Sequence, residues 1–313
     1  MSRAIMYTSF GGPDVLELQD IPEPHAGSDE VRVRVAAAGL NPMDWGLSSN
    51  PDAAARFGIT LPSGFGTDFA GTIDEVGSHV KDFQMGDRVF GGALGRAVAD
   101  SIVLKVPSST ETLHHTPSGI PDVIASALSV AGLTADAALS VIGVKSGETV
   151  LIGGAAGGVG TFAVQLAKLA SATVIGTGSE DSFDYLRKLG ALPVTYGPGL
   201  AGRVRQLAPN GVDAATVLVG TETIDVALAL GISPARISAI AAGPHPPGGV
   251  HATGGAQARP GALESITNAI RSGKLTVPIA ATFPIERTRE AVTLQRGGHV
   301  HGKVVITLSE KDS

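Results

Sequence analysis

The chain has 313 residues, of which 43% are hydrophobic, and its formal net charge is −6 at pH 7. This length predicts two domains, and the hydrophobic content is high enough to bury a core and argues against disorder. The acidic balance disfavours nucleic acid or an anionic membrane as the main partner, and the lack of cysteine excludes disulfides and thiolate metal ligands.

The first ten residues lack the long apolar segment of a signal peptide. The longest uncharged apolar stretch, residues 123–135, is too short to span a bilayer and is interpreted as a buried helix. We therefore expect a cytoplasmic protein that is not embedded in a membrane.

Residues 1 to about 120 are expected to be rich in β-structure. The segment Val31–Val35 alternates apolar and charged residues, which is the period-2 pattern of a half-buried strand. Further strands are expected over 70–76 and 87–90, with turns where glycine and proline cluster.

From residue 121 onward, predicted helices and strands alternate, which implies a parallel, doubly wound sheet. Helices are expected over residues 123–139, 159–170, 181–189, 200–207, 223–229, 263–271 and 287–294. Strands are expected over residues 149–152, 173–176, 193–196, 214–219, 236–241, 279–283 and 303–308, with a short one near residue 250.

A glycine-rich loop, Gly-Gly-Ala-Ala-Gly-Gly-Val-Gly over residues 153–160, stands between a predicted strand and a predicted helix. This context is typical of a dinucleotide-binding site, although Ala155 replaces the first glycine of the G-x-G-x-x-G pattern. A Cβ at Gly157 would hold the backbone away from a pyrophosphate, and Gly160 would permit tight packing of helix on strand. The alternative is a βα turn without a ligand.

The end of the next predicted strand bears on the choice of cofactor. A carboxylate that binds the ribose 2′-hydroxyl would stand there, but the sequence has Gly178 followed by Ser179. Room for a 2′-phosphate favours NADP(H). Glu180 and Asp181 follow directly, with no arginine or lysine beside them.

Several motifs in order along the chain resemble the quinone oxidoreductase branch of the medium-chain dehydrogenase/reductase superfamily. Residues 38–44 resemble the family's A-x-G-x-N-x-x-D segment, and residues 66–77 its G-x-D-x-x-G-x-V-x-x-V-G signature. Residues 155–160 match its A-A-G-G-V-G loop, and residues 302–304 its C-terminal G-K-V strand.

The resemblance implies an α/β protein with a GroES-like, β-rich catalytic domain (residues 1–120 and 258–313) and a Rossmann nucleotide-binding domain (residues 121–257). Zinc-dependent relatives carry Gly-His-Glu where this chain has Gly66-Thr67-Asp68, so we expect no catalytic zinc. The adjacent His114 and His115 are interpreted as a surface pair in a linker.

The resemblance also implies site residues. It places Asn41 and Asp44 near the nicotinamide as the candidate catalytic residues. Candidate cofactor-binding residues are Asn41, Thr134, Ala156, Gly157, Gly158, Val159, Gly160, Gly178, Ser179, Tyr196, Val219, Gly220 and Lys303. From the residues alone, Asn41 could equally cap a turn, Asp44 cap a helix and Tyr196 pack at a strand end.

We hypothesise a homodimeric enzyme that transfers a hydride from NADPH to a quinone or an α,β-unsaturated carbonyl without zinc. An edge strand over 236–241 could pair with its copy in such a dimer. The alternatives are a zinc-independent alcohol or aldehyde reductase and an NADPH-binding sensor without turnover. Nucleic-acid binding is disfavoured because the sequence has no basic run.

Overall fold

The computed structural model describes residues 1–308, which divide into two compact units. Residues 1–130, 279–298 and 303–308 form the first unit; residues 131–278 and 299–302 form the second. The predicted boundaries fall instead after residues 120 and 257. That the two units act as a catalytic and a nucleotide-binding domain remains a prediction.

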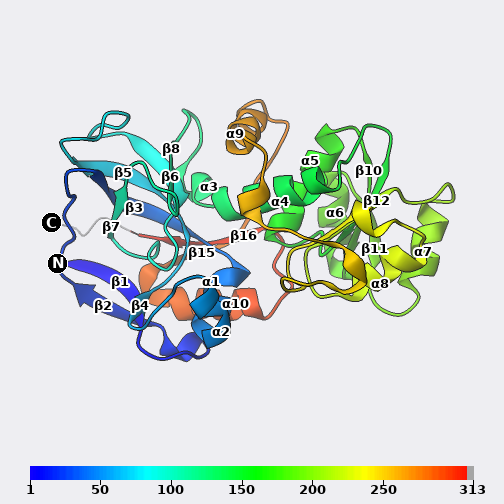
Figure 1. Ribbon diagram of the computed structural model, residues 1–313, viewed down its shortest axis with the longest axis horizontal. Coiled ribbons are helices and arrows are strands. Elements are labelled where there is room, and N and C mark those ends of the chain that lie inside the picture. The colour runs from blue at the N-terminus through cyan, green and yellow to red at the C-terminus, as the bar shows by residue number, and fades with distance from the viewer. Residues whose placement is uncertain (309–313) are drawn as a thin grey trace. The chain divides into compact units, whose positions relative to one another are not determined.

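The first unit contains two β-sheets, and most of its strands are antiparallel (Figure 1). The smaller sheet has the order β2-β1-β4, formed by β1 (Ser2–Tyr7), β2 (Glu17–Ile21) and β4 (Ser63–Gly64). The larger has the order β15-β16-β3-β5-β6-β8, and β7 also pairs with β3. Its strands are β3 (Glu30–Leu40), β5 (Asp68–Val76), β6 (Arg88–Gly92), β7 (Ser101–Lys105), β8 (Thr112–His115), β15 (Ile279–Pro284) and β16 (Lys303–Thr307).

Strand β3 organises the larger sheet. Its predicted alternation is confirmed: Val31, Val33 and Val35 are buried, whereas Arg34 between them is exposed. The strand pairs antiparallel with β16, so the C-terminal part of the chain completes a sheet begun near its N-terminus (Figure 1). This pairing brings residue 303 beside residues 40 and 41.

Four helices and two short 3-10 turns accompany these sheets. They are α1 (Pro42–Ser49), α2 (Pro51–Arg56), α3 (Asp122–Ala125), α10 (Thr288–Arg296), η1 (Pro13–Val15) and η6 (Ile285–Arg287). Helix α1 begins directly after β3, with proline at its first position, where the absent N–H has no partner to lose. It therefore places Asn41 and Asp44 at the end of β3.

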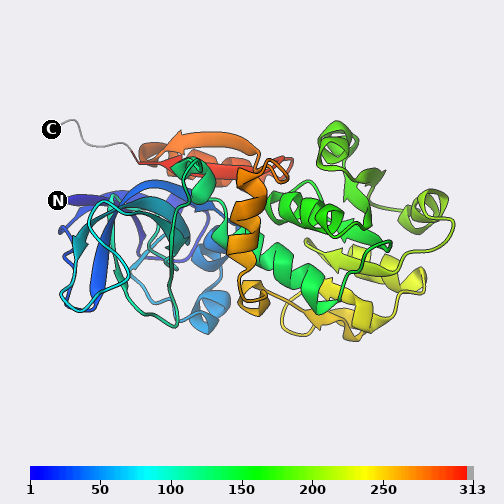
Figure 2. The same ribbon diagram turned by 90° about the horizontal axis from the view of Figure 1, so that it is seen from above.

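The second unit contains a parallel sheet with the order β11-β10-β9-β12-β13-β14 and helices on both faces (Figure 2). Its strands are β9 (Thr149–Gly153), β10 (Thr173–Gly178), β11 (Leu192–Thr195), β12 (Ala214–Val217), β13 (Ile237–Ala239) and β14 (His251–Ala252). This is the strand order of a Rossmann fold, in which the order of strands along the sheet reverses at β9. The predicted fold class is confirmed.

The helices of the second unit follow its strands in alternation. They are α4 (Ser129–Val141), α5 (Gly158–Leu169), α6 (Phe183–Leu189), α7 (Leu200–Leu207), α8 (Glu222–Ala229) and α9 (Ala262–Arg271), with 3-10 turns η2 (Glu180–Ser182), η3 (Pro234–Arg236), η4 (Pro247–Gly249) and η5 (Gly255–Gln257). Buried aliphatic side chains such as Leu151, Ile175 and Val217 fill the space between sheet and helices.

The prediction of one helix over 123–139 is wrong, because the chain turns at residues 126–128 between α3 and α4. The turn brings the Ser126 carbonyl so close to β3 that a Cβ at Gly39 would lie 2.1 Å from its oxygen. It also directs the Val130 N–H at the Asp68 carboxylate, at 3.0 Å from Oδ1. The break between α3 and α4 depends on these tertiary contacts, so the local pattern of apolar residues does not predict it.

Two further predictions need correction. The strand expected over 236–241 is not an edge, because β13 pairs with β12 on one side and with the two-residue β14 on the other. The residues His114 and His115 do not lie in a linker: both are exposed, but they belong to β8 and contact the rings of Phe90 and Phe83. Within residues 1–308, no helix is long and apolar enough to cross a membrane.

Candidate functional site

The glycine-rich loop lies at the point of the second unit where the strand order reverses. Strand β9 has β10 on one side and β12 on the other, and the loop leads from β9 into α5. Gly157 precedes the first residue of this helix, and no side chain caps its N-terminus. The N–H groups of the first turn are therefore available to an anion, which the helix dipole also attracts.

Close contacts fix the shape of this loop. The Thr177 side chain accepts a hydrogen bond from the Gly154 N–H at 3.0 Å, and its carbonyl accepts one from the Ala155 N–H at 3.2 Å. A Cβ at Gly160 would lie 2.4 Å from the Ala155 oxygen, so only glycine permits this packing. A Cβ at Gly157 would meet only the Gly154 oxygen, at 3.6 Å, so the space outside Gly157 is open to a ligand.

The end of β10 is more crowded than its sequence indicates. A Cβ at Gly178 would lie 2.2 Å from Ser182 Oγ, which donates a hydrogen bond to the Ser179 carbonyl at 2.6 Å. A side chain at this position would therefore force Ser182 to shift, whatever the ligand. Glu180 and Asp181 are exposed, which favours screening of their charge by solvent.

A basic residue that the sequence did not reveal reaches this edge of the sheet. Gly178 pairs in register with Thr195 of β11, and Arg203 of α7 donates to the Thr195 carbonyl through Nε (3.2 Å) and Nη2 (2.8 Å). Arg203 lies in α7, which is separated from the end of β10 by α6 and β11. Only the pairing of β10 with β11 connects the two places, and no motif marks it.

The other candidate cofactor residues are distributed over both units. Tyr196 and Val219 follow β11 and β12, and both side chains are exposed. Val219 packs over the loop, since a Cβ at Gly154 would lie 2.8 Å from its Cγ1, and Gly220 next to it has a φ of +59°. Thr134 is buried in α4.

The first unit holds a cluster of five buried polar residues, which we call the buried polar cluster. Its members come from the ends of β3, α1, β5 and β16 and the residue before β5: Asn41, Asp44, Thr67, Asp68 and Lys303. Sequence analysis predicted Asn41, Asp44 and Lys303 as site residues and treated Thr67 and Asp68 only as replacements for metal ligands.

Lys303, Asn41 and Asp68 form one half of the cluster. The Lys303 ammonium donates to Asn41 Oδ1 at 2.5 Å and to the Leu40 carbonyl at 3.0 Å, and lies 4.0 Å from Asp68 Oδ2. The Asn41 amide nitrogen donates to Asp68 Oδ2 at 3.0 Å and to the Gly39 carbonyl at 3.3 Å. Both amide hydrogens of Asn41 therefore have protein partners.

Asp44 and Thr67 form the other half. The Asp44 carboxylate accepts hydrogen bonds from the Asn41 backbone N–H (2.8 Å, Oδ2) and from the Thr67 hydroxyl (2.7 Å, Oδ1). The first of these is a helix-capping contact at the start of α1, as the alternative interpretation of these residues anticipated. The capping contact fixes Asp44 in the interior instead of leaving it in solvent.

Burial dominates the acid–base behaviour of the cluster. It raises the pKa of Asp44 to about 7, against the opposing effect of the Thr67 and Asn41 hydrogen bonds. It also raises the pKa of Asp68 to about 6, against the charge of Lys303. The pKa of Lys303 is lowered by burial, although both carboxylates oppose this.

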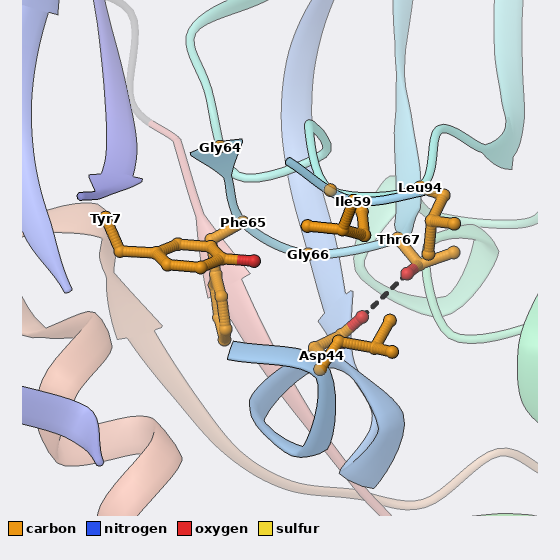
Figure 3. A pocket seen from close by; sticks show the side chains of 10 residues that line it. Tyr7, Asp44, Ile59, Gly64, Phe65, Gly66, Thr67 and Leu94 are labelled. Carbon is orange, nitrogen blue, oxygen red and sulfur yellow. Dashed lines mark hydrogen bonds between the residues drawn. The ribbon is translucent and has the colours of Figure 1, made fainter. Parts of the chain in front are cut away.

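A small cavity adjoins Asp44 and Thr67 (Figure 3). Its volume is about 10 Å³, which is room for one water molecule. The Tyr7 hydroxyl points toward it from β1, and Ile59, Phe65 and Leu94 supply apolar walls (Figure 3). The cavity can hydrate Asp44, but it is too small for an organic substrate.

No group of three or more histidine, aspartate or glutamate side chains that could hold a metal ion occurs in the described part of the chain. In the buried polar cluster, the Lys303 ammonium is the cation, and it lies 4.0 Å from the Asp68 carboxylate. The donor set at Thr67 and Asp68 therefore differs from the nitrogen- and carboxylate-rich set that zinc requires.

Comparisons with known proteins agree with this architecture. Residues 27–179 match the model of the alcohol dehydrogenase GroES-like domain, and residues 158–253 match that of the zinc-binding dehydrogenase family. The chain belongs to the medium-chain dehydrogenase/reductase superfamily, in its quinone oxidoreductase branch.

Relatives were found by sequence and by structure. A quinone oxidoreductase of Pseudomonas aeruginosa is 41% identical over 57% of this chain and 53% of its own length. An NADPH-dependent alkenal/one oxidoreductase of Arabidopsis thaliana chloroplasts is 29% identical over 97% of this chain and 79% of its own length. The alignments cover 53–60% of the first three curated relatives.

A solved mycobacterial structure in complex with NADPH superposes with a TM-score of 0.84. It is 28% identical to this chain and covers 98% of it and 100% of its own chain. The likeness therefore extends over both units.

Proposed function

We propose that this protein is an oxidoreductase that uses NADPH to reduce a quinone or an α,β-unsaturated carbonyl, and that it does so without zinc. One observation carries the proposal: an uncapped helix N-terminus follows an open glycine loop at the reversal of strand order in a Rossmann sheet. Ligands of such sheets bind at this point, outside the carboxyl ends of the strands. Relatives named as quinone and alkenal/one oxidoreductases support the substrate class.

The glycine loop fits a dinucleotide. The N–H groups at the start of α5 would hold the pyrophosphate, Val219 would give an apolar contact beside it, and Ser179 and Tyr196 would lie toward the adenosine end. Bound NADPH would supply the hydride. The remaining work of the chain is to orient the two reactants and to exclude water.

Asn41 and Asp44 act in this proposal by fixing local structure and not by donating a proton. Both side chains are buried, and their polar atoms are directed at Lys303, Asp68, Thr67 and backbone groups. The proton that accompanies the hydride would come from solvent or from a ribose hydroxyl.

Oxidation of NADPH by the purified protein tests this function. We expect turnover with quinones and with enones, and none with saturated aldehydes or ketones, because polarising an isolated carbonyl takes a Lewis acid or a positioned proton donor, and the proposal assigns neither to this chain. Preference for a saturated aldehyde would instead favour an alcohol or aldehyde reductase. Tight binding of NADPH in calorimetry, without turnover across the panel, would indicate a sensor.

Zinc independence is tested separately. We expect elemental analysis of the active enzyme to find no stoichiometric zinc, and chelators to leave the turnover number unchanged, because no donor set for zinc occurs in residues 1–308. One tightly held zinc per chain, lost together with activity, would contradict this.

A further inference from the structure

We propose that Arg203 is the cation that recognises the 2′-phosphate of NADPH in this protein. The inference rests on the proposed function, and in particular on the binding of a nicotinamide dinucleotide at the glycine loop. The sequence offers no basic residue beside the predicted 2′-phosphate position. Ser179 is followed by two acidic residues, and no lysine or arginine lies next to it.

Strand pairing brings Arg203 to the place where the phosphate would lie. Gly178 and Thr195 are register partners in neighbouring parallel strands, about 4.8 Å apart. The Arg203 guanidinium is anchored on the Thr195 carbonyl at 2.8 Å. It therefore lies at the carboxyl edge of β11, adjacent to the turn that Gly178 and Ser179 form at the end of β10.

The charge of this guanidinium is not balanced by a carboxylate. Its hydrogen-bond partners within residues 1–308 are all backbone carbonyls: besides Thr195, these are Tyr196 (3.1 Å), Gly197 (3.2 Å) and Pro198 (2.8 Å). No ion pair of Arg203 occurs among the described residues, whereas Arg3, Arg32 and Arg236 are each paired with an acid. Carbonyl dipoles orient a guanidinium but leave its unit charge available to an anion.

The hydrogen bonds also leave one donor for a ligand. Nη1 carries two hydrogens, and Pro198 is its one acceptor within residues 1–308. A phosphate oxygen can take the second hydrogen in a charge-assisted bond. The same carbonyl contacts hold the 195–198 turn, so Arg203 also fixes the position of Tyr196, which is a candidate cofactor-binding residue.

Selectivity follows from the difference between the two cofactors. NADPH and NADH share every group except the 2′-phosphate, so a cation near that position strengthens NADPH binding alone. Arg205 of the same helix provides a matched control: it is exposed and donates to the Ala229 carbonyl at 3.0 Å, at the end of α8 and not at β10.

Calorimetric titration of NADPH and NADH into the wild type and the variants Arg203→Gln, Arg203→Lys and Arg205→Gln tests the proposal. We expect Arg203→Gln to raise the Kd of NADPH about tenfold or more and that of NADH less than threefold. Arg203→Lys keeps the charge and should keep the NADPH-to-NADH affinity ratio within about threefold of wild type. Arg205→Gln should change neither Kd more than twofold.

Two results would overturn the assignment. They are an unchanged NADPH-to-NADH affinity ratio in Arg203→Gln, whether or not both affinities fall, and a wild type that prefers NADH. If Arg203→Gln does not fold, a collapsed ratio in folded Arg203→Lys overturns it equally. A wild type that binds neither cofactor would instead refute the proposed function, so the two failures are distinguishable.

Discussion

Asp44 shows how one residue can match a catalytic motif and still have a structural role. Its carboxylate is buried between the Asn41 N–H and the Thr67 hydroxyl, and both contacts can be kept by a neutral group. A protonated aspartate accepts from the N–H with one oxygen and can donate to the hydroxyl with the other. Asparagine offers the same acceptor and a donor in the same places.

We therefore expect Asp44→Asn to fold and to retain much of its turnover number. If Asp44 were a catalytic acid, removal of its proton would lower kcat by about 10³ or more with cofactor affinity unchanged. Steady-state kinetics combined with NADPH titration separates the two roles.

The same variant should reveal the raised pKa of Asp44. Between the unfolded value of about 4 and the folded value of about 7, the folded protein holds a proton that the unfolded chain has lost. Wild-type stability must therefore fall as pH rises through this window, a loss that Asp44→Asn avoids. Relative to wild type, the variant should gain about 1–3 kcal/mol in free energy of unfolding between pH 5 and pH 8. A pH-independent difference in urea denaturation would contradict this.

At the scale of elements, the turn from β10 to α6 decides how cofactor choice can be tested. Gly178→Asp is the obvious change from sequence, but its Cβ would collide with Ser182 and disturb the turn. Ser179 is half-buried and next along the chain, so a carboxylate there introduces the negative charge without that collision. We expect Ser179→Asp to lower the NADPH-to-NADH ratio of kcat/KM by roughly 30-fold, or ~2 kcal/mol. Ser179→Asn is the neutral control and should lower it less.

Asp68 and Lys303 connect β5, β16 and the first turn of α4. Lys303→Met would leave Asp68 as an uncompensated buried charge and Asn41 Oδ1 without its donor, at a cost of about 3–5 kcal/mol. Adding Asp68→Asn removes that charge and keeps an acceptor for the Val130 N–H. The double variant should lose less unfolding free energy than the two single variants lose together, by at least ~1 kcal/mol in urea denaturation. Strict additivity would show that the pair is not coupled.

At the scale of the whole molecule, the proposed homodimer needs a different edge from the one that the sequence suggested. Strand β13 is covered by β14, which has only two residues, so the exposed edge on that side is short. Short edges pair weakly, and a dimer would depend more on side-chain packing than on an extended sheet. We expect light scattering to give twice the 31.5 kDa mass of one chain, and a value near 31.5 kDa would reject the dimer.

The fold was predictable where the pattern is local. Regular alternation from residue 149 onward located β9 to α8 to within two residues at each end, because each buried strand and each amphipathic helix has its own period. Helices α1 and α2 were not predicted, although Asn41-Pro42 and Asn50-Pro51 are start signals for helices. Their apolar pattern was too short to support those signals.

The candidate site was predictable in part. Motif spacing indicated the glycine loop and Asn41, but the contacts that define them are tertiary. Lys303 meets Asn41 across a pairing of β16 with β3, and Arg203 contacts Thr195, which is the register partner of Gly178 in the pairing of β11 with β10. The pairing of strands as distant in sequence as β16 and β3, and the side-chain contact of Arg203 with β11, cannot be inferred from one chain without the fold.

The Val130 amide proton can report the charge of a buried side chain without any mutation. Its hydrogen is shared between the two oxygens of Asp68, at 3.0 Å and 3.3 Å from the nitrogen. An amide proton bonded to an ionised carboxylate resonates further downfield than one bonded to the neutral acid. In a nuclear magnetic resonance titration, this single signal would therefore follow the charge of Asp68, with a midpoint near its pKa of about 6. A binding event that altered the buried polar cluster would move that midpoint, so one backbone resonance could report on it.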